Sequence, residues 1–344
     1  MSARAELRRG LRVVGGAARF AGAALGGPRA LLGVGWSITM RCNARCPFCS
    51  RHSGPDGLPT ATGLRLIDEL GEMGCLRLHF TGGEPLVRKD LPELLDRAGE
   101  RGLRRTINTN GILLARRPEV IARTDAFVVS VDGSPEVHDG YRGPGAFAHM
   151  VEGVEALAAA NKRFAFSFAL FEKSLDHVDF LIDLARRYDT FLIVQPGAMH
   201  VIGSSEPNPE RPELARYREI IRRMREDPRW RPWVWNSTPA LEHLEGFPEG
   251  APMRCHAGRI TCRMEVDGRL YPCSRTVLDP RAEDAPNAAE LGMREAFARL
   301  RPIDCEGAQC WAAHNIEKNL VFALDPRACW NLATRNYASR ARRA

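Results

Sequence analysis

The sequence has 344 residues, of which 44% are hydrophobic and 26% are charged, and its formal net charge is +7. A chain of this length is long enough to bury one large core, or a large core and a small satellite domain, and its ordinary charged fraction does not suggest disorder. There is no run of about 18 apolar residues and no signal-peptide pattern, so the sequence predicts neither a transmembrane helix nor export.

The N-terminal segment, residues 1–35, is basic and amphipathic. Apolar residues recur at helical spacing from Leu7 to Leu25, beside a face that carries Arg8 and Arg12. Such a helix can lie weakly on an anionic membrane surface, or it can pack against the domain that follows. Elsewhere the arginines are spread along the whole chain, which argues against a phosphate-binding patch and predicts no nucleic-acid partner.

Residues 36–202 alternate between short apolar runs and helical patterns, which predicts an α/β fold with a parallel sheet that is curved or partly closed into a barrel. The chemistry of such folds lies at the carboxyl ends of the strands. The predicted strands are Trp36–Met40, Arg77–Phe80, Arg104–Asn108, Phe127–Val131, Phe164–Leu170 and Phe191–Gln195. The predicted helices are Gly63–Met73, Leu91–Arg101, Pro118–Arg123, Phe147–Ala160 and Leu175–Tyr188.

A loop with three cysteines follows the first strand. Cys42, Cys46 and Cys49 have the spacing Cys-x3-Cys-x2-Cys. Thiolates of this kind hold iron–sulfur clusters, and three of them leave one iron open for an outside ligand. A structural zinc site is the alternative, but it favours paired Cys-x2-Cys modules and four ligands.

A glycine-rich turn follows the second predicted strand and has the sequence Thr81-Gly-Gly-Glu-Pro-Leu86. The glycines allow backbone groups to approach a ligand closely, and Glu84 can accept a hydrogen bond from an ammonium group. Because this turn lies at the carboxyl end of the strand, we expect it to line the same site as the cysteine loop.

Together these motifs resemble the radical S-adenosylmethionine (SAM) superfamily, over roughly residues 36–200. The motifs that carry the resemblance are Cys42-Asn-Ala-Arg-Cys-Pro-Phe-Cys49, Gly82-Gly-Glu-Pro85, Asn108-Thr-Asn-Gly111, Ser130-Val-Asp-Gly133 and the run from Val137 to Phe147. The resemblance implies a partial (β/α)6 barrel. It also implies a [4Fe–4S] cluster on Cys42, Cys46 and Cys49 that binds SAM.

The resemblance implies roles for individual residues as well. Phe48 would lie near the adenine, the edge from Gly82 to Glu84 would take the methionine amino group, and Ser130 and Arg142 would bind its carboxylate. The implied cofactor-binding residues are Phe48, Gly82, Gly83, Glu84, Pro85, Asn108, Ser130 and Arg142.

The chain changes character after residue 202. Residues 203–254 are rich in proline and tryptophan and are predicted to be a linker region with one helix, Glu213–Glu226. Residues 255–330 form a small cysteine-rich C-terminal domain with a hairpin that turns at Asp267-Gly268, and residues 331–344 form a basic tail.

The C-terminal cysteines resemble those of the SPASM and twitch domains, which carry auxiliary [4Fe–4S] clusters. We expect one such cluster on Cys255, Cys273, Cys305 and Cys310, with Cys329 as the alternative fourth ligand. The sequence departs from the usual pattern, because Cys305 and Cys310 are separated by four residues and not by two. A structural zinc site on the same residues is the alternative.

The resemblance predicts a radical SAM enzyme of the oxidoreductase or transferase type. It would cleave SAM reductively to a 5′-deoxyadenosyl radical, which takes a hydrogen atom from an unidentified small molecule, lipid or peptide. An electron donor such as flavodoxin or ferredoxin is the expected partner. The cysteine content predicts a cytoplasmic location, with peripheral membrane contact as an alternative. The alternative function is a non-catalytic iron–sulfur or zinc-binding assembly module.

Overall fold

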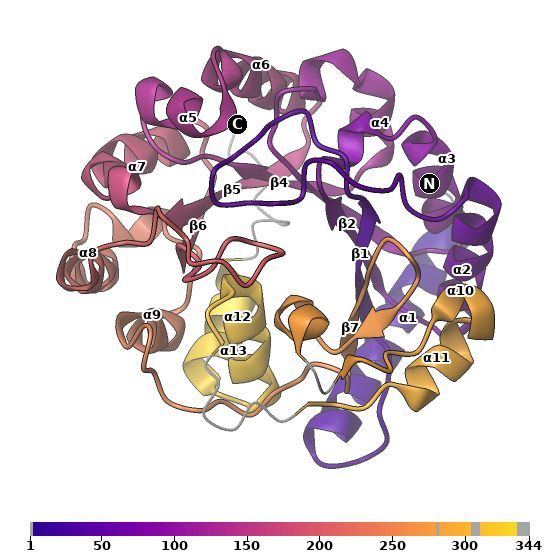
Figure 1. Ribbon diagram of the computed structural model, residues 1–344. Coiled ribbons are helices and arrows are strands. Elements are labelled where there is room, and N and C mark those ends of the chain that lie inside the picture. The colour runs from indigo at the N-terminus through magenta and orange to yellow at the C-terminus, as the bar shows by residue number, and fades with distance from the viewer. Residues whose placement is uncertain (1–2, 280–281, 304–309, 336–344) are drawn as a thin grey trace.

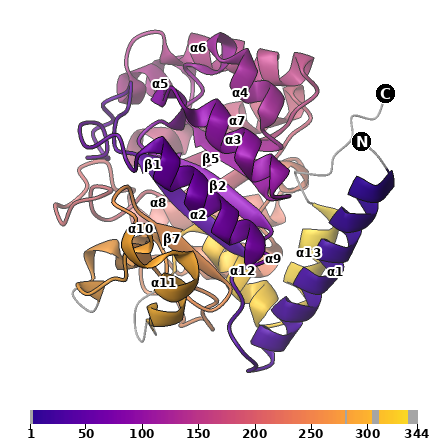
Figure 2. The same cartoon turned by 90° about the vertical axis from the view of Figure 1, so that its right-hand side faces the viewer.

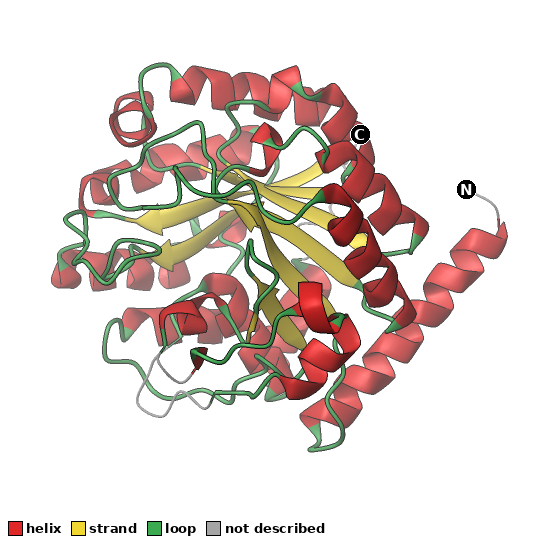
Figure 3. Cartoon of the chain, turned by 45° about the vertical axis from the view of Figure 1, so that its right-hand side comes forward, coloured by secondary structure: helices red, strands yellow, loops and turns green. Residues whose placement is uncertain are grey.

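The computed structural model describes residues 3–279, 282–303 and 310–335 (Figure 1). One sheet with the strand order β6-β5-β4-β3-β2-β1-β7-β8 lies at its centre, and the helices surround its outer side (Figure 3). Neighbouring strands from β6 to β7 are parallel, and β8 is antiparallel to β7. The strands are β1 (Gly33–Thr39), β2 (Arg77–Gly82), β3 (Arg104–Thr109), β4 (Ala126–Ser130), β5 (Arg163–Leu170), β6 (Leu192–Pro196), β7 (Thr261–Met264) and β8 (Leu270–Tyr271).

The helices that connect successive strands cover the outer face of the sheet. Apolar residues at alternate strand positions, among them Trp36 and Phe80, are fully buried against these helices. The predicted α/β class with a partial parallel barrel is confirmed. The helices are α1 (Ala3–Ala24), α2 (Thr60–Glu72), α3 (Leu91–Glu100), α4 (Pro118–Arg123), α5 (Pro135–Arg142), α6 (Ala146–Ala159), α7 (Val178–Arg187), α8 (Leu214–Glu226), α9 (Thr238–Glu245), α10 (Ala288–Leu291), α11 (Met293–Arg299), α12 (Ala313–Phe322) and α13 (Pro326–Thr334).

The C-terminal segment completes the barrel sheet. The predicted hairpin forms as β7 and β8, and Gly268 in its turn has a positive φ of 89°. Strand β7 also pairs in parallel with β1, with Gly33 opposite Thr261. The sheet therefore runs across the predicted boundary between the core and the C-terminal domain. Helix α12 lies inside the ring of helices, in the gap between β6 and β7 (Figure 1).

Helix α1 packs along the side of the barrel (Figure 2), where the ring of Phe20 meets that of Phe322 of α12 edge-on, with centroids 5.9 Å apart. Arg12 and Arg19 donate hydrogen bonds to backbone carbonyls at the C-terminal ends of α2 and α3: Arg12 to Arg101 O and to Gly71 O at 3.1 Å, and Arg19 to Met73 O at 3.0 Å. Carbonyl groups in the last turn of a helix have no partner within that helix, and a cation there also interacts favourably with the negative end of the helix dipole. The sequence allowed this helix either to lie on a membrane surface or to pack against the following domain. The structure shows the packed arrangement. In the described part of the chain, no helix is long and apolar enough to cross a bilayer.

Two adjacent glycines of α1 test this packing. A side chain at Gly16 would meet Leu76 at 2.4 Å, whereas Gly15 has nothing within 4 Å. We expect Gly16→Leu to lower the free energy of unfolding by about 1–3 kcal/mol through overpacking. Gly15→Leu is the matched control and should be neutral or stabilising, because leucine favours a helix more than glycine does. Thermal unfolding and limited proteolysis of both variants would decide, and equal effects would contradict the packing.

Candidate functional site

The cysteine loop begins where β1 ends and is held against the glycine turn after β2. The amide of Gly83 donates to Thr39 O at 2.8 Å, and that of Glu84 donates to Arg41 O at 2.9 Å. A Cβ atom at Gly82 would lie 2.3 Å from Thr39 O, and one at Gly83 would lie 2.2 Å from Arg41 O. The close approach that requires these glycines is therefore an approach to the backbone of the cysteine loop.

Backbone amides and neighbouring charges surround the thiols of the cysteine loop. Cys42 Sγ accepts a hydrogen bond from the amide of Ala44, and Cys49 Sγ accepts one from the amide of Arg51, each at 3.4 Å. The charges of the thiolates act on one another, since ionisation of Cys42 or Cys49 raises the pKa of Cys46. Amide hydrogen bonds to sulfur of this kind tune the potential of an iron–sulfur cluster.

Burial shapes the acidity of these thiols. It raises the pKa of Cys42, and it raises the pKa of Cys46 to about 11, while the nearby Arg142 guanidinium opposes both shifts. Buried thiolates of this kind need a cationic partner such as an iron centre. Within the described residues no group of three ligands surrounds one ion position.

Glu84 is buried and links the ends of β2 and β3. Its Oε1 accepts hydrogen bonds from Leu86 N at 3.1 Å and Thr109 Oγ1 at 2.9 Å, and its Oε2 accepts one from Asn110 N at 2.7 Å. Burial raises the pKa of Glu84 to about 7, although these hydrogen bonds oppose the shift. Contact of this carboxylate with a methionine ammonium stays a prediction. What the structure shows is that it joins the loops around the thiols.

Asn110 connects the turn after β3 to the cysteine loop. Its Nδ2 donates to Asn43 Oδ1 at 2.8 Å and lies 3.8 Å from Cys42 Sγ. Asn110 belongs to the Asn108-Thr-Asn-Gly111 motif, but the family resemblance implies Asn108 of that motif as the cofactor-binding residue. The Oδ1 atom of Asn108 is buried and has no hydrogen-bond partner among the described residues.

The guanidinium of Arg142 is held in a fixed position, and its positive charge acts on the thiols. Its guanidinium forms a two-point ion pair with the buried Asp132, with Nη2 3.1 Å from Oδ1. Although burial disfavours its charge, Asp132 raises the pKa of Arg142. Burial lowers the pKa of the adjacent His138 to about 4, so this imidazole is neutral at pH 7. Arg142 is therefore a held cation, as binding of a carboxylate requires. Ser130 is half-buried at the end of β4.

Phe48 lies in an aromatic cluster beside the thiols. Its ring stacks on Phe171 with centroids 4.0 Å apart, and the ring of Tyr141 meets it edge-on at 5.4 Å. Cys46 and Cys49 pack against this cluster. The cluster shields one side of the loop from water. The sequence pointed to Phe48 alone, because Tyr141 and Phe171 come from α5 and the end of β5.

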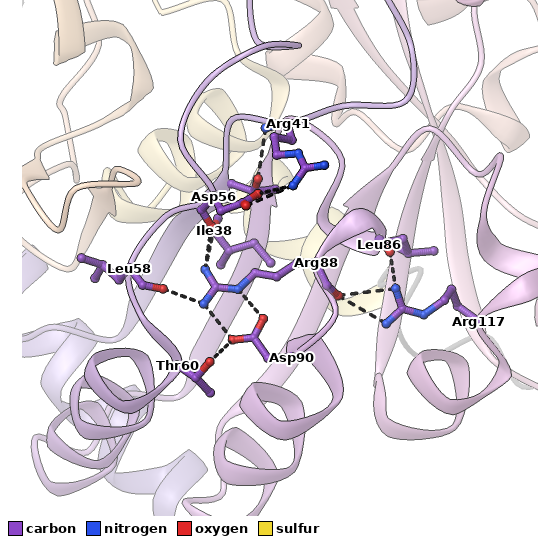
Figure 4. Close-up of polar contacts among 10 residues, drawn as sticks. Ile38, Arg41, Asp56, Leu58, Thr60, Leu86, Arg88, Asp90 and Arg117 are labelled. Atoms are coloured by element: carbon purple, nitrogen blue, oxygen red, sulfur yellow. Dashed lines mark hydrogen bonds and ion pairs between the residues drawn. The ribbon is translucent and has the colours of Figure 1, made fainter.

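Arg88 braces the return of the cysteine loop, and sequence reasoning missed it. Its guanidinium donates to Ile38 O and Leu58 O, each at 2.7 Å, and to Asp56 O at 3.1 Å, and it pairs with Asp90 at 2.7 Å (Figure 4). These contacts join the end of β1 to the segment that leaves the loop. The only signal in the sequence was its place directly after the glycine turn.

The second cysteine group is only partly described. Cys255, Cys273 and Cys310 are half-buried, whereas Cys305 lies outside the described residues. Cys329, the alternative ligand, is half-buried on α13. The auxiliary cluster therefore stays a prediction.

The sequence is similar to known proteins over most of this architecture. The Radical SAM superfamily profile matches residues 36–185. The mycofactocin maturase MftC of Mycobacterium ulcerans is 31% identical over 262 residues, which cover 71% of this chain and 68% of that protein. The AdoMet-dependent heme synthase of Methanosarcina barkeri is 34% identical over 180 residues, which cover 48% of this chain and 51% of that protein. The chain thus spans about half the length of the heme synthase that it matches.

Solved structures show the same fold. The crystal structure of Streptococcus suis SuiB bound to S-adenosylmethionine matches with a TM-score of 0.63 at 16% identity, over 78% of this chain and 66% of that one. At this identity the likeness concerns the fold alone.

The bracing by Arg88 can be tested through stability. Arg88→Met would leave the carboxylate of Asp90 and several buried carbonyls without their donor, so we expect unfolding to require about 3–5 kcal/mol less free energy. Arg41→Gln removes the exposed ion pair with Asp56 in the same loop and should have little effect. Denaturant unfolding of both apo variants measures the difference, and equal stabilities would contradict the assigned role.

Proposed function

The chain belongs to the radical SAM superfamily of enzymes, and from this membership we propose that it removes a hydrogen atom from a substrate held in its barrel. Enzymes of this family use a [4Fe–4S] cluster and SAM, and the bound cluster supplies the electron for reductive cleavage of SAM. The observation that carries the proposal is the loop of Cys42, Cys46 and Cys49 at the carboxyl ends of the strands, facing the fixed charge of Arg142. Membership in an enzyme family argues against the alternative function, a non-catalytic assembly module that binds iron–sulfur or zinc.

The surrounding residues bind, orient and exclude water. Cys42, Cys46 and Cys49 hold the cluster, and Arg142 with Ser130 binds the carboxylate of SAM. Because Asp132 fixes the guanidinium, little reorganisation accompanies binding. The aromatic cluster of Phe48 keeps water away from the thiols.

The glycine turn and the turn after β3 complete the cofactor site. The backbone edge of Gly82, Gly83 and Pro85, together with Glu84, would take the ammonium group of SAM, and Asn108 would contribute to the same cofactor site. Glu84 has one free lone pair beyond its three hydrogen bonds, which is enough for one further donor.

The substrate is a small molecule, a lipid or a peptide. The relatives are named for different products, one for heme and one for mycofactocin, so their names do not narrow the class. The enzyme takes its electron from a donor such as flavodoxin or ferredoxin. Its cysteine-rich loops suit the reducing cytoplasm. Val14 and Leu25 of α1 are exposed and provide at most a weak contact with a membrane surface.

An auxiliary [4Fe–4S] cluster on Cys255, Cys273, Cys305 and Cys310 would aid electron transfer. The support is the number and spacing of the cysteines, and the half-buried state of the three that are described. A cluster with four protein thiolates is closed, so it serves electron transfer better than substrate binding.

Removing the thiols of the first loop tests the proposed function. The triple variant Cys42→Ala, Cys46→Ala, Cys49→Ala should stay folded but lose reductive cleavage of SAM to 5′-deoxyadenosine, because no ligand remains for the first cluster. The assay uses anaerobically reconstituted protein with a strong reductant. Cys75→Ala is the control, since Cys75 is buried outside both groups and should leave cleavage intact. Undiminished cleavage by the triple variant would refute the proposal.

Metal analysis of the same triple variant tests the auxiliary cluster. We expect it to retain about four iron atoms per chain, because four other thiolates remain. Adding Cys273→Ala should remove this iron and make residues 255–329 sensitive to protease. Zinc in place of iron would favour the structural-zinc alternative. Iron that survives loss of Cys310 but not of Cys329 would show that Cys329 is the fourth ligand.

A further inference from the structure

A buried ion network joins the cysteine loop to the C-terminal hairpin. Glu265, which follows β7, accepts a hydrogen bond on its Oε2 atom from Arg51 Nη1 at 2.9 Å. Its Oε1 atom accepts one from Arg263 Nε at 2.8 Å and one from Ser37 Oγ at 3.1 Å. The pairing of β1 with β7 brings Ser37 and Glu265 together. We name Ser37, Arg51, Arg263 and Glu265 the Glu265 network.

The network is withdrawn from solvent, and it stays charged. The side chains of Arg51, Arg263 and Glu265 are only 9–15% exposed. Burial opposes the charge of Glu265, but the two arginines outweigh this effect and lower the pKa of Glu265. Glu265 is therefore ionised at neutral pH, and arginine is always protonated. Two cations thus enclose one anion, which leaves one positive charge in excess.

Arg51 connects this network to a thiol of the cysteine loop. Its backbone amide donates to Cys49 Sγ at 3.4 Å, while its guanidinium binds Glu265. The amide of Ala44 makes a similar hydrogen bond to Cys42 Sγ, but alanine has no long side chain to hold it in place. One arginine side chain and two hydrogen bonds therefore separate the carboxylate of Glu265 from the thiol of Cys49.

The other end of the network reaches the second cysteine group. Burial lowers the pKa of Arg263, whereas the charges of Glu265 and of an ionised Cys273 oppose this shift. Cys273 follows β8, and Arg263 lies on the neighbouring strand β7. The C-terminal hairpin thus supplies charges that connect the surroundings of the two cysteine groups.

Stability alone does not account for three largely buried charges. A buried ion pair gains little over apolar side chains of the same volume, because the cost of desolvation offsets the attraction. Beside a ligand of an iron–sulfur cluster, however, such charges have a second effect. Net charge and hydrogen bonds to sulfur set the reduction potential of a cluster, and a buried charge acts over a longer range than an exposed one.

We propose that Glu265 is a positioning residue for the first cluster: it holds Arg51 against the cysteine loop, and the charges of this pair set the reduction potential of the cluster. The inference rests on the proposed function and deepens it, because the C-terminal segment then controls how readily the first cluster accepts its electron. Reduction adds one negative charge to the cluster, so a nearby anion opposes it and a nearby cation favours it.

Two variants that break the same ion pair from opposite sides test the proposal. Glu265→Gln removes the anion, so we expect reduction of the first cluster to become about tenfold more favourable, a rise of about 59 mV for one electron. Arg51→Gln removes a cation but retains the backbone amide, so we expect a fall of similar size. A redox titration of the anaerobically reconstituted full chain, monitored by EPR, measures both shifts. The signal that changes when SAM is added identifies the first cluster.

Matched controls come from an exposed ion pair of the same loop. Asp56→Asn and Arg41→Gln make the same changes of charge at side chains that are 69% and 62% exposed. Water and salt screen these charges, so both potentials should stay close to that of the wild type. Glu265→Asp keeps the charge on a shorter side chain and should also retain the potential. A shift for Glu265→Asp as large as that for Glu265→Gln would overturn the proposal.

A purely structural role predicts a different pattern. Both Gln variants lose the same contact, so denaturant unfolding of the apo chains should show a loss of stability for each, and structural damage would move both potentials in one direction. In the double variant Arg51→Gln, Glu265→Gln the two changes of charge cancel, so we expect its potential to return toward that of the wild type even though the contact is lost.

The outcomes separate this inference from the proposed function. Opposite shifts for the two single variants, with recovery in the double variant, support the inference. Equal or absent shifts in a chain whose cluster responds to SAM overturn the inference and leave the proposed function standing. A wild-type chain without a cluster that responds to SAM would overturn the proposed function and this inference together.

Discussion

The carboxylate of Glu84 is the interaction on which the site depends. It joins the turn after β2 to the turn after β3, and its own amide holds the backbone of the cysteine loop. Three chain segments thus meet at one buried acid, and each additional hydrogen bond offsets the cost of burying it. The glycines before Glu84 allow this contact, because any side chain there would strike the loop. The position of the thiols is therefore set mainly by backbone packing.

Much of this arrangement could be predicted from the sequence. Parallel strands place their carboxyl ends at one edge, so motifs that follow β1, β2, β3 and β4 had to converge. Local signals identified the cysteines, the glycine turn and the β7–β8 hairpin. The hairpin formed as expected because an Asp-Gly turn is decided by local backbone preferences.

What the sequence did not show depends on contacts between distant segments. Arg88 contacts a buried carbonyl and Asn110 contacts the Cys42 thiol, and both contacts form only when the fold brings distant segments together. The pairing of β7 with β1 was equally hidden, because a short apolar run carries no information about its neighbour. The entry of α12 into the barrel followed from neither periodicity nor composition. Tertiary packing decides such features, and a single sequence records it poorly.

The parallel pairing of β1 with β7 also has a consequence for synthesis on the ribosome. Ser37 at the end of β1 and Glu265 just after β7 are hydrogen-bonded across a sequence separation of 228 residues. Until β7 emerges, one edge of β1 has no strand to pair with, although the five later strands on its other side are already complete. An unpaired strand edge is a site of aggregation. The nascent chain therefore carries an open edge through most of its translation, and the last quarter of the protein closes it.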